Sequence, residues 1–294
     1  MWAEGRFSHM AGFAAKAREL GLARIEANTS VPPRTFSELL ETTVPISSIH
    51  SPCPAILSFR EIPISSLSLS SLNESKRMEA ISFTKRTIDL AANMNARAIV
   101  LHMGEAPVDL NLQDRLYRLH DEGYTQTEEY GQAKEKLVHQ RISLAHICVD
   151  GSRRSLQDLS KCSRQKGIML GLETRLHFRE IPNMDEMAEP VNGVSESQVG
   201  YWHDPGHAEL QQQLGFSLYE ESLSRFKYRM VGIQLHDIRA ISDHQAPGTG
   251  NMNWQSIAKY LRQGIAEGCE IGEWNDEEQM QGIVKLLQKK AILD

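Results

Sequence analysis

Short apolar segments alternate with longer amphipathic stretches along almost the whole chain, and this alternation limits the possible fold more than any other feature. The short segments occupy residues 23–28, 45–52, 97–104, 168–175, 199–207, 230–238 and 269–274. Helical patterning fills the intervals between them, most clearly over residues 11–21, 75–95, 108–120 and 128–165. Repeated strand–helix units of this kind predict a parallel sheet with helical crossovers.

The length of the chain narrows this class further. The chain has 294 residues, 40% of them apolar, which suits one large α/β barrel with a substantial core. Seven strands are one fewer than such a barrel needs, and only residues 1–10 remain to supply the first one. Because no Pro- or Gly-rich linker interrupts the chain, we predict a single (β/α)₈-barrel domain over residues 1–294, with its first strand weak or missing.

Charge and cysteine content limit the partners and the compartment. The net charge of −6 argues against a nucleic-acid partner, which would need a local basic patch. The four cysteines form no CxxC pair, which gives no signal for a thiolate zinc site and fits a reducing cytoplasm. The N-terminus lacks the features of a signal peptide, and no apolar run approaches the roughly 20 residues that cross a bilayer. We therefore expect a cytoplasmic protein without a membrane partner.

Imidazole and carboxylate side chains gather where the predicted strands end. They are His50, His102, Glu173, Asp204, His207, His236 and Glu273. The carboxyl ends of parallel strands meet at one edge, where α/β proteins bind ligands. Side-chain alternation puts Gly171 with Glu173, and Gly232 with His236, on the face opposite the large aliphatic residues. We therefore expect these side chains to point toward the barrel axis.

The composition of this set indicates a metal site. A single His or Glu at a strand end is usually structural, but seven such groups at one edge are not expected by chance. Converging carboxylates repel one another unless a cation neutralises them. Imidazole together with carboxylate suits Zn, Mn or Co, and purely oxygen sites suit Mg. The loop after residue 236 adds Asp237, Asp243, His244 and a PGTG turn.

At these residues the chain resembles the xylose-isomerase-like TIM-barrel superfamily. The matching pieces are ELGLARIEAN, SIHSPCP, IVLHMG, LGLETR, HDPGHA, LHDI with DHQAPGTGNMNW, and EIGEWND, which together span residues 19 to about 276. The superfamily contains sugar isomerases and epimerases, inosose dehydratase-like enzymes and the endonuclease IV family. The order and spacing of the pieces are specific for the superfamily, and no piece is specific for one reaction.

The isomerase and epimerase branch implies one divalent metal ion (Mn, Zn, Co or Mg) and a set of ligands. By resemblance these ligands are Glu173, Asp204, His236 and Glu273. The two Glu residues are then the catalytic acid and base, which move a proton through a metal-stabilised enediolate. Glu270 competes for the last position. We prefer Glu273 because it shares a face with Cys269 and Ile271.

The endonuclease IV branch implies three zinc ions and nine ligands. Eight of those positions fall on His50, His102, Glu173, Asp204, His207, His236, His244 and Glu273. The ninth would be an Asp at position 242, where this chain has Ser242, and Asp243 is one residue out of register. This departure puts a complete three-zinc site in doubt.

Together these features favour a metal-dependent isomerase or epimerase of a sugar, polyol or sugar phosphate. The alternatives are an endonuclease IV-like nuclease of abasic DNA, a related metal-dependent lyase or dehydratase, and a non-catalytic binding protein. We expect substrate-binding or second-metal roles for His50, His102, His207, His244 and Arg239. A phosphate group would need cations such as Arg175, Arg179 and Arg239. The resemblance also allows a homo-oligomer.

Four further residues leave two interpretations open. Trp202, Trp254 and Trp274 lie beside the proposed site residues and suit either a sugar-binding wall or core packing. Glu26 ends the first predicted strand and faces inward, where a structural role as a hydrogen-bond acceptor is the more common one.

Overall fold

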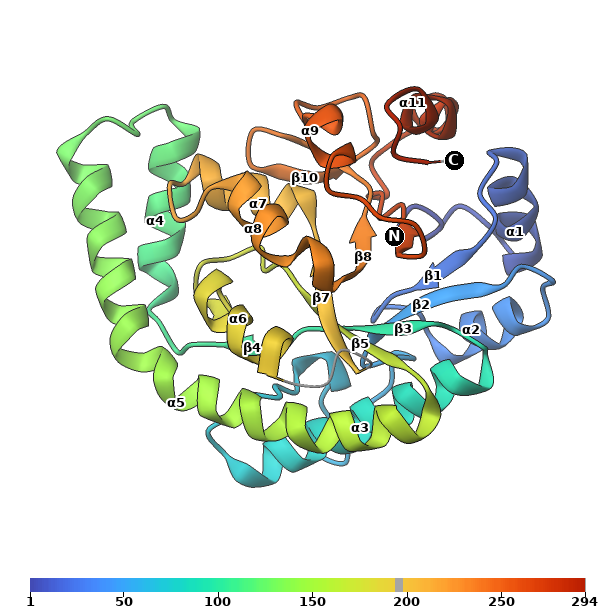
Figure 1. The fold of residues 1–294 in the computed structure, drawn as a ribbon, viewed down its shortest axis with the longest axis horizontal. Coiled ribbons are helices and arrows are strands. Elements are labelled where there is room, and N and C mark those ends of the chain that lie inside the picture. Colours follow the sequence, from blue (N-terminus) through green and yellow to red (C-terminus); the bar gives the residue numbers. More distant parts are fainter. Residues whose placement is uncertain (194–197, 294) are drawn as a thin grey trace.

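Parallel strands form the central sheet of the protein, as a computed structural model that describes residues 1–193 and 198–293 shows. The strands follow one another in chain order: β1 (Ile25–Ala27), β2 (Ile46–Ser51), β3 (Ala98–Leu101), β5 (Met169–Glu173), β7 (Val199–His203), β8 (Met230–Gln234) and β11 (Ala266–Gly268). Each neighbouring pair is parallel. The predicted α/β class is therefore confirmed, and the strands curve into a nearly closed barrel (Figure 1).

The barrel stays open along a seam between its edge strands β1 and β11, which no hydrogen-bonded ladder joins among the described residues. Residues 1–10 form turns and the first residue of a helix instead of the missing strand. Side chains from this segment bind the loop that follows β11. The indole N–H of Trp2 donates to the carbonyl oxygen of Asn275 at 3.0 Å, and Arg6 donates to the carbonyl oxygens of Glu273 and Asn275 at 2.5 and 2.6 Å. The prediction of a weak or missing first strand is confirmed.

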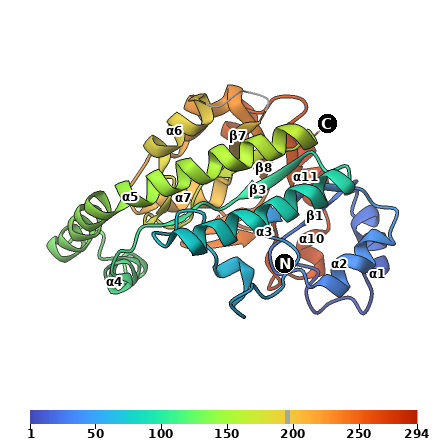
Figure 2. The same cartoon turned by 90° about the horizontal axis from the view of Figure 1, so that it is seen from below.

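Helices connect the strands and cover the outside of the sheet (Figures 1 and 2). They are α1 (Met10–Glu19), α2 (Pro33–Leu40), α3 (Glu74–Asn93), α4 (Leu110–Asp121), α5 (Glu128–Lys166), α6 (Met184–Gly193), α7 (Pro205–Gln213), α8 (Tyr219–Phe226), α9 (Trp254–Ala258), α10 (Glu277–Met280) and α11 (Ile283–Lys289), with 3₁₀ turns at Ile64–Ser66 and Lys227–Arg229. Asn73 caps α3 by accepting from the N–H of Lys76, and Gly167 ends α5 at φ 68°. The pair α4 and α5 extends beyond the barrel (Figure 1).

Two short antiparallel ladders stand beyond the carboxyl ends of the barrel strands. β4 (Gly104–Glu105) pairs with β6 (Glu180–Ile181), and β9 (Asp237–Arg239) pairs with β10 (Ser242–Gln245). These ladders fix the loops that follow β3, β5 and β8, and those loops carry several of the predicted site residues. Among the described residues, no helix is long and apolar enough to cross a membrane.

A single aromatic side chain fills the barrel interior below the site. Trp202 on β7 is completely buried, and a Cβ atom at Gly171 on β5 or at Gly232 on β8 would collide with its ring. The predicted inward phase is therefore right for these strands. Because side chains alternate along a strand, Glu173 and Asp204 lie on the same inward side as Gly171 and Trp202, one step nearer the mouth.

The last predicted strand was wrong in position. The sequence pattern favoured residues 269–274, whereas β11 ends at Gly268. The chain then turns across the mouth, where the N–H of Gly272 donates to the carbonyl oxygen of His244 at 2.8 Å. Residues beyond Gly268 therefore belong to a loop, and parity counted from residue 269 does not describe which way their side chains point.

Candidate functional site

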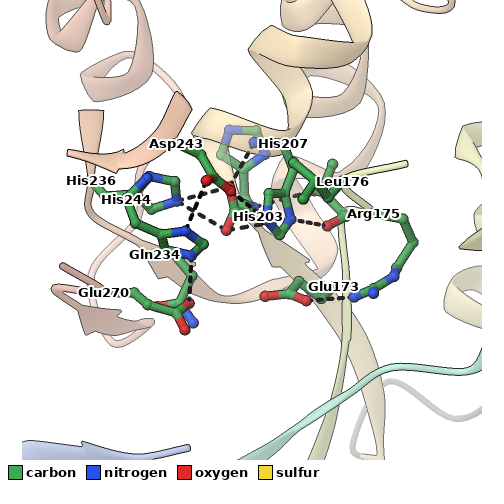
Figure 3. A network of polar contacts seen from close by, with 12 residues as sticks. Glu173, Arg175, Leu176, His203, His207, Gln234, His236, Asp243, His244 and Glu270 are labelled. Carbon is green, nitrogen blue, oxygen red and sulfur yellow. Dashed lines mark hydrogen bonds and ion pairs between the residues drawn. The ribbon is translucent and has the colours of Figure 1, made fainter. Parts of the chain in front are cut away.

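The candidate site lies at the carboxyl ends of the strands, where six elements each contribute a side chain; Figure 3 shows those of Glu173, His236 and Glu270 among them. His50 belongs to β2, His102 follows β3, Glu173 ends β5, Asp204 follows β7, His236 follows β8 and Glu270 follows β11. The loop after β8 adds Asp243 and His244 within β10. The structure thus brings together the imidazoles and carboxylates that the sequence placed at the strand ends, with one exchange described below.

The HDPGH segment places two site residues by local chemistry. Asp204 is the N-cap of α7 and accepts the N–H of His207 at 2.8 Å, and Pro205 takes the first helical position. Gly206 lies so close to the ring of His236 that a Cβ atom there would collide with it. The other contact of Asp204 is with His236, whose Nε2 lies 3.0 Å from Oδ1. The cap therefore aims the Asp204 carboxylate into the barrel.

Glu173 is buried, and one of its oxygens carries two contacts. Oε2 lies 2.7 Å from Nε2 of His102 and accepts from Nη1 of Arg175, also at 2.7 Å. The guanidinium of Arg175 also donates to Oε1 of Glu180 at 2.6 Å. Burial raises the pKa of Glu173, but the adjacent His102 and Arg175 outweigh it and hold the pKa below its usual value. Glu173 is therefore an ionised carboxylate.

His50 forms a polar cluster with Glu26 and Gln234 beside the seam. Its Nε2 lies 3.1 Å from Oε1 of Glu26, and Nε2 of Gln234 donates to the same oxygen at 3.0 Å. Burial lowers the pKa of His50, but the negative charges of Glu26 and Glu270 reverse this and raise it to about 10. Glu26 thus accepts hydrogen bonds, as the sequence led us to expect, and it also lies near enough to count among the potential ligands.

A second polar cluster contains Asp204, His207, Asp243 and His244. His207 is 3.5 Å from Oδ2 of Asp204 and 3.5 Å from Oδ2 of Asp243. His244 is 3.1 Å from Asp243 and 3.7 Å from Oε2 of Glu270, and its ring stacks on that of His236 at 4.6 Å. Against the opposing effect of burial, these carboxylates raise the pKa of His207 to about 9 and that of His244 to about 11.

Asp243 is a residue whose role the sequence register did not reveal. The aligned position, Ser242, is exposed at the start of β10. The β9–β10 ladder is irregular here, and His244 has a φ of 54°, which is rare for a residue with a side chain. This irregularity turns Asp243 toward His207. The acidic character of Asp243 was visible in the sequence, but the backbone irregularity was not.

Glu270, and not Glu273, joins the other carboxylates. Glu270 follows Gly268, and a Cβ atom at Gly268 would face Gln234 and Glu26 inside the barrel. Glu270 lies near Glu173 and Asp204 and 3.7 Å from Nε2 of His244, whereas Glu273 is exposed in the loop. The preference for Glu273 rested on a strand placed too late in the chain, and the structure corrects it.

Four groups of side chains bring potential metal-ligand atoms within 4.8 Å of one another among the described residues. They are Glu173 with Asp204 and Glu270; His50 with His102 and Glu173; Glu26 with His50 and Glu270; and Asp204 with His207 and His244. The first group has three ionised carboxylates, because burial alone would raise their pKa values and neighbouring His or Arg charges lower each of them. Such a donor set fits a divalent cation.

The arginines and tryptophans that the sequence analysis named differ in their exposure and in their partners. Arg175 is buried between two glutamates, Arg179 contacts Glu105 and Gln113, and Arg239 is exposed and donates to the carbonyl oxygen of Thr249. Trp202 and Trp254 are buried, and Trp274 is 54% exposed. Core packing therefore accounts for the first two tryptophans.

The PGTG turn proves to be a structural part of the β8–α9 loop. The carboxylate of Asp237 accepts the backbone N–H groups of Gly248 and Met252, both at 2.8 Å. A side chain at Gly250 would collide with the carbonyl group of Ile238. The glycine is needed because one backbone segment passes close to another, and Asp237 organises the loop that carries His244.

Known protein structures share this architecture. D-psicose 3-epimerase from Clostridium cellulolyticum H10, solved with D-tagatose, is 14% identical with a TM-score of 0.66, covering 97% of this chain and 94% of that one. A D-tagatose 3-epimerase-like protein is 17% identical with a TM-score of 0.62 and coverages of 96% and 93%. IolI, solved with a zinc atom, is 14% identical with a TM-score of 0.59 and coverages of 97% and 92%. At these identities the likeness concerns the fold.

Two sequence comparisons complete the picture. The uncharacterised protein y4fM of Sinorhizobium fredii is 24% identical over 187 residues, which are 63% of this chain and 50% of that protein. The chain therefore matches about half the length of this relative. The model of a family described as a xylose isomerase-like TIM barrel matches residues 14–290. This chain belongs to the family of xylose isomerase-like TIM barrels.

Proposed function

We propose that the protein is a metal-dependent isomerase or epimerase of a neutral sugar or polyol. The observation that carries the proposal is the convergence of the Glu173, Asp204 and Glu270 carboxylates, whose ligand atoms lie within 4.8 Å of one another at the barrel mouth. Several proteins of the same fold are named as epimerases of ketoses. The proposal transfers that class of reaction, and no particular substrate, to this chain.

The metal ligands in this proposal are Glu173, Asp204, His236 and Glu270. His236 lies 3.0 Å from Asp204, and a shared cation would replace this direct contact. Its Nδ1 accepts the backbone N–H of His244 at 3.0 Å and lies 3.2 Å from the carbonyl oxygen of Asp237, and these contacts hold the ring with Nε2 turned toward the carboxylate. When bound, a divalent ion would polarise the carbonyl and hydroxyl oxygens of the substrate.

Glu173 and Glu270 are the proposed proton-transfer residues. They approach the site from β5 and from the end of β11, and β7 and β8 lie between these strands in the sheet. Two carboxylates on different sides of a substrate are able to remove a proton from one face of a carbon and return it to the other. Neighbouring charges lower the pKa of each carboxylate, so both begin the reaction ionised.

The arginines at the mouth of the barrel already bind other groups of the protein. This supports a neutral substrate in preference to a sugar phosphate. Arg175 is held between Glu173 and Glu180, and Arg179 contacts Glu105. A phosphate near these guanidinium groups would displace an existing acidic partner and approach several carboxylates. The third arginine, Arg239, is exposed and bound to a backbone carbonyl group.

Two measurements test the proposal. Elemental analysis of the purified protein should find about one equivalent of Mn, Co, Mg or Zn, reduced in Glu173→Gln. A panel of neutral ketoses, keto-glycosides and inososes is then incubated in D₂O, where turnover should place deuterium on the carbon beside the carbonyl group. Absence of any bound metal after loading with each ion would refute the proposal.

A second candidate, an endonuclease IV-like hydrolase, is favoured by one specific observation. The group of His50 with His102 and Glu173 and the group of Asp204 with His207 and His244 each share one carboxylate with the proposed metal site. Two or three zinc equivalents per chain, together with cleavage of DNA that contains an abasic site, would support this function instead. The net charge of −6 speaks against DNA as a partner.

A further inference from the structure

Glu173 is shared by two of the potential metal-ligand groups. It belongs to the group with Asp204 and Glu270, and also to the group with His50 and His102. A carboxylate in this position is able to bridge two ions, one on each oxygen. Whether the centre holds one ion or more therefore depends on what occupies the second oxygen of Glu173.

We propose that Arg175 occupies this oxygen in place of a second metal ion and thereby keeps the centre mononuclear. This inference rests on the proposed metal-dependent function. The Oε2 atom of Glu173 accepts from Nη1 of Arg175 at 2.7 Å and lies 2.7 Å from Nε2 of His102. No contact to Oε1 is found among the described residues, which leaves this oxygen for an ion shared with Asp204 and Glu270.

The guanidinium of Arg175 is held firmly in this position. Its side chain is 8% exposed, and Nη2 donates to Oε1 of Glu180 at 2.6 Å. The other oxygen of Glu180 accepts the backbone N–H of His177 at 2.7 Å. Release of Arg175 from Glu173 would leave a buried carboxylate without its partner, which is strongly unfavourable.

The surrounding backbone is anchored as well. Glu180 lies in β6, which pairs with β4 only two residues beyond His102. Arg141 on α5 donates to the carbonyl oxygens of Phe178 and Glu180 at 2.5 and 2.9 Å, and it pairs with Glu186 at 2.8 Å. The same small ladder therefore lies next to both groups that contact Oε2, because His102 precedes β4 by two residues and Arg175 binds Glu180 on β6.

Electrostatics explains how one arginine excludes an ion. A metal bound to His50, His102 and Glu173 would need a carboxylate oxygen at about 2.0–2.2 Å. The fixed positive charge 2.7 Å from Oε2 would repel a divalent ion at that distance and already satisfies the oxygen. Arg175 thus supplies the charge that a second ion would otherwise supply.

The test is the number of metal ions bound by Arg175 variants. Wild type, Arg175→Met and Arg175→Lys are loaded with Zn²⁺, desalted and analysed for zinc, and calorimetric titration with Zn²⁺ gives the number of sites independently. We expect about one equivalent for wild type and for Arg175→Lys, which keeps the charge, and about two for Arg175→Met. Adding His102→Ala to Arg175→Met should return the value to one.

The outcomes separate this inference from the proposed function. Two or more equivalents in wild type, or one equivalent in a folded Arg175→Met protein, would overturn the role of Arg175 and leave metal dependence intact. No zinc in wild type would refute the proposed function itself. If Arg175→Met does not fold, the double variant Arg175→Met with Glu180→Gln removes both charges of the buried pair and is expected to bind two equivalents.

Discussion

The site side of the barrel and its open seam hold their functional residues in different ways. On the site side, β5, β7 and β8 form one continuous ladder, and Glu173, Asp204 and His236 sit at or just beyond its ends. At the seam, no ladder joins β1 and β11 among the described residues, and Gln234 of β8 instead donates to Glu26 of β1 at 3.0 Å. Backbone register positions the first three residues, whereas loop contacts position Glu270.

The two regions therefore differ in how firmly they position their side chains. A residue at the end of a paired strand moves only if the ladder moves. Glu270 depends on the turn after β11, which is held by Gly272 and by contacts of Asn275 with Trp2 and Arg6. The seam is therefore the region where we expect substitutions to change stability more than metal binding, and four predictions test this contrast.

The largest effect should come from exchanging the two candidate glutamates. Glu270→Gln removes a proposed ligand and proton-transfer group, so we expect roughly 10²–10⁴-fold lower turnover and loss of bound metal. Glu273→Gln changes an exposed side chain in the same loop and should behave like wild type. Turnover of the best substrate and metal content are measured for both. The reverse ranking would restore Glu273 as the ligand.

The second prediction concerns the metal-free protein, in which protonated histidines balance the carboxylates. The folded-state pKa values of His50, His207 and His244 are raised from 6.5 to about 10, 9 and 11. A raised pKa stabilises the fold fully below pH 6.5, and this stabilisation disappears as the pH rises through the folded value. The melting temperature in EDTA should therefore fall by roughly 5–10 °C between pH 6 and pH 9.5.

Added metal should reverse that trend, because a bound cation would neutralise the carboxylates that the protonated histidines otherwise balance, and ion binding strengthens as the pH rises. Thermal melts with and without Zn²⁺ across this pH range measure both slopes. A metal-free protein that becomes more stable toward pH 9.5 would contradict the assignment of charged histidines.

The third prediction addresses the seam directly. Gln234→Leu removes the donor that reaches Glu26 and leaves that carboxylate with fewer partners, so we expect a loss of about 1–3 kcal/mol in the free energy of unfolding. The proposed ligands are Glu173, Asp204, His236 and Glu270, so the metal stoichiometry should not change. Urea unfolding and zinc analysis measure the two quantities. Loss of metal with unchanged stability would show that the seam and the site are not separable.

The smallest effect is expected at the rim of the seam. Arg6→Met removes two hydrogen bonds to backbone carbonyl oxygens of the loop that follows β11. Because this region is partly exposed, the loss should be about 1 kcal/mol or less, with unchanged turnover. A large loss of turnover would mean that the N-terminal segment, and not the turn itself, sets the position of Glu270.

The sequence predicted the ladder side well because strand periodicity carries direct physical information. Alternation of side chains placed Glu173 and His236 on the inward face, and the strand order followed from repeated crossovers. Glu270 could not be obtained in this way. Its direction depends on where β11 ends, and the short run CEIGEW has the composition of a strand while the backbone already turns.

The contacts of Asp243 and Arg175 were also not predicted from the sequence. Asp243 reaches His207 only because the β9–β10 ladder is irregular and His244 adopts a left-handed conformation. Arg175 was one of three cations available to a phosphorylated substrate by sequence, and in the structure it lies between Glu173 and Glu180. Asp243 is placed by a backbone irregularity and Arg175 by ion pairs with its near neighbours Glu173 and Glu180, and a periodic pattern encodes neither.

The packing of Trp202 against Gly171 and Gly232 has a consequence for how such barrels diverge. A larger residue at either glycine requires a smaller one at position 202, since the indole already fills the space that a Cβ atom would need. These three positions are therefore expected to vary together among relatives. Exchange of the indole for a small side chain would leave a deeper cavity beneath Glu173 and Asp204. The barrel mouth would then admit a larger molecule.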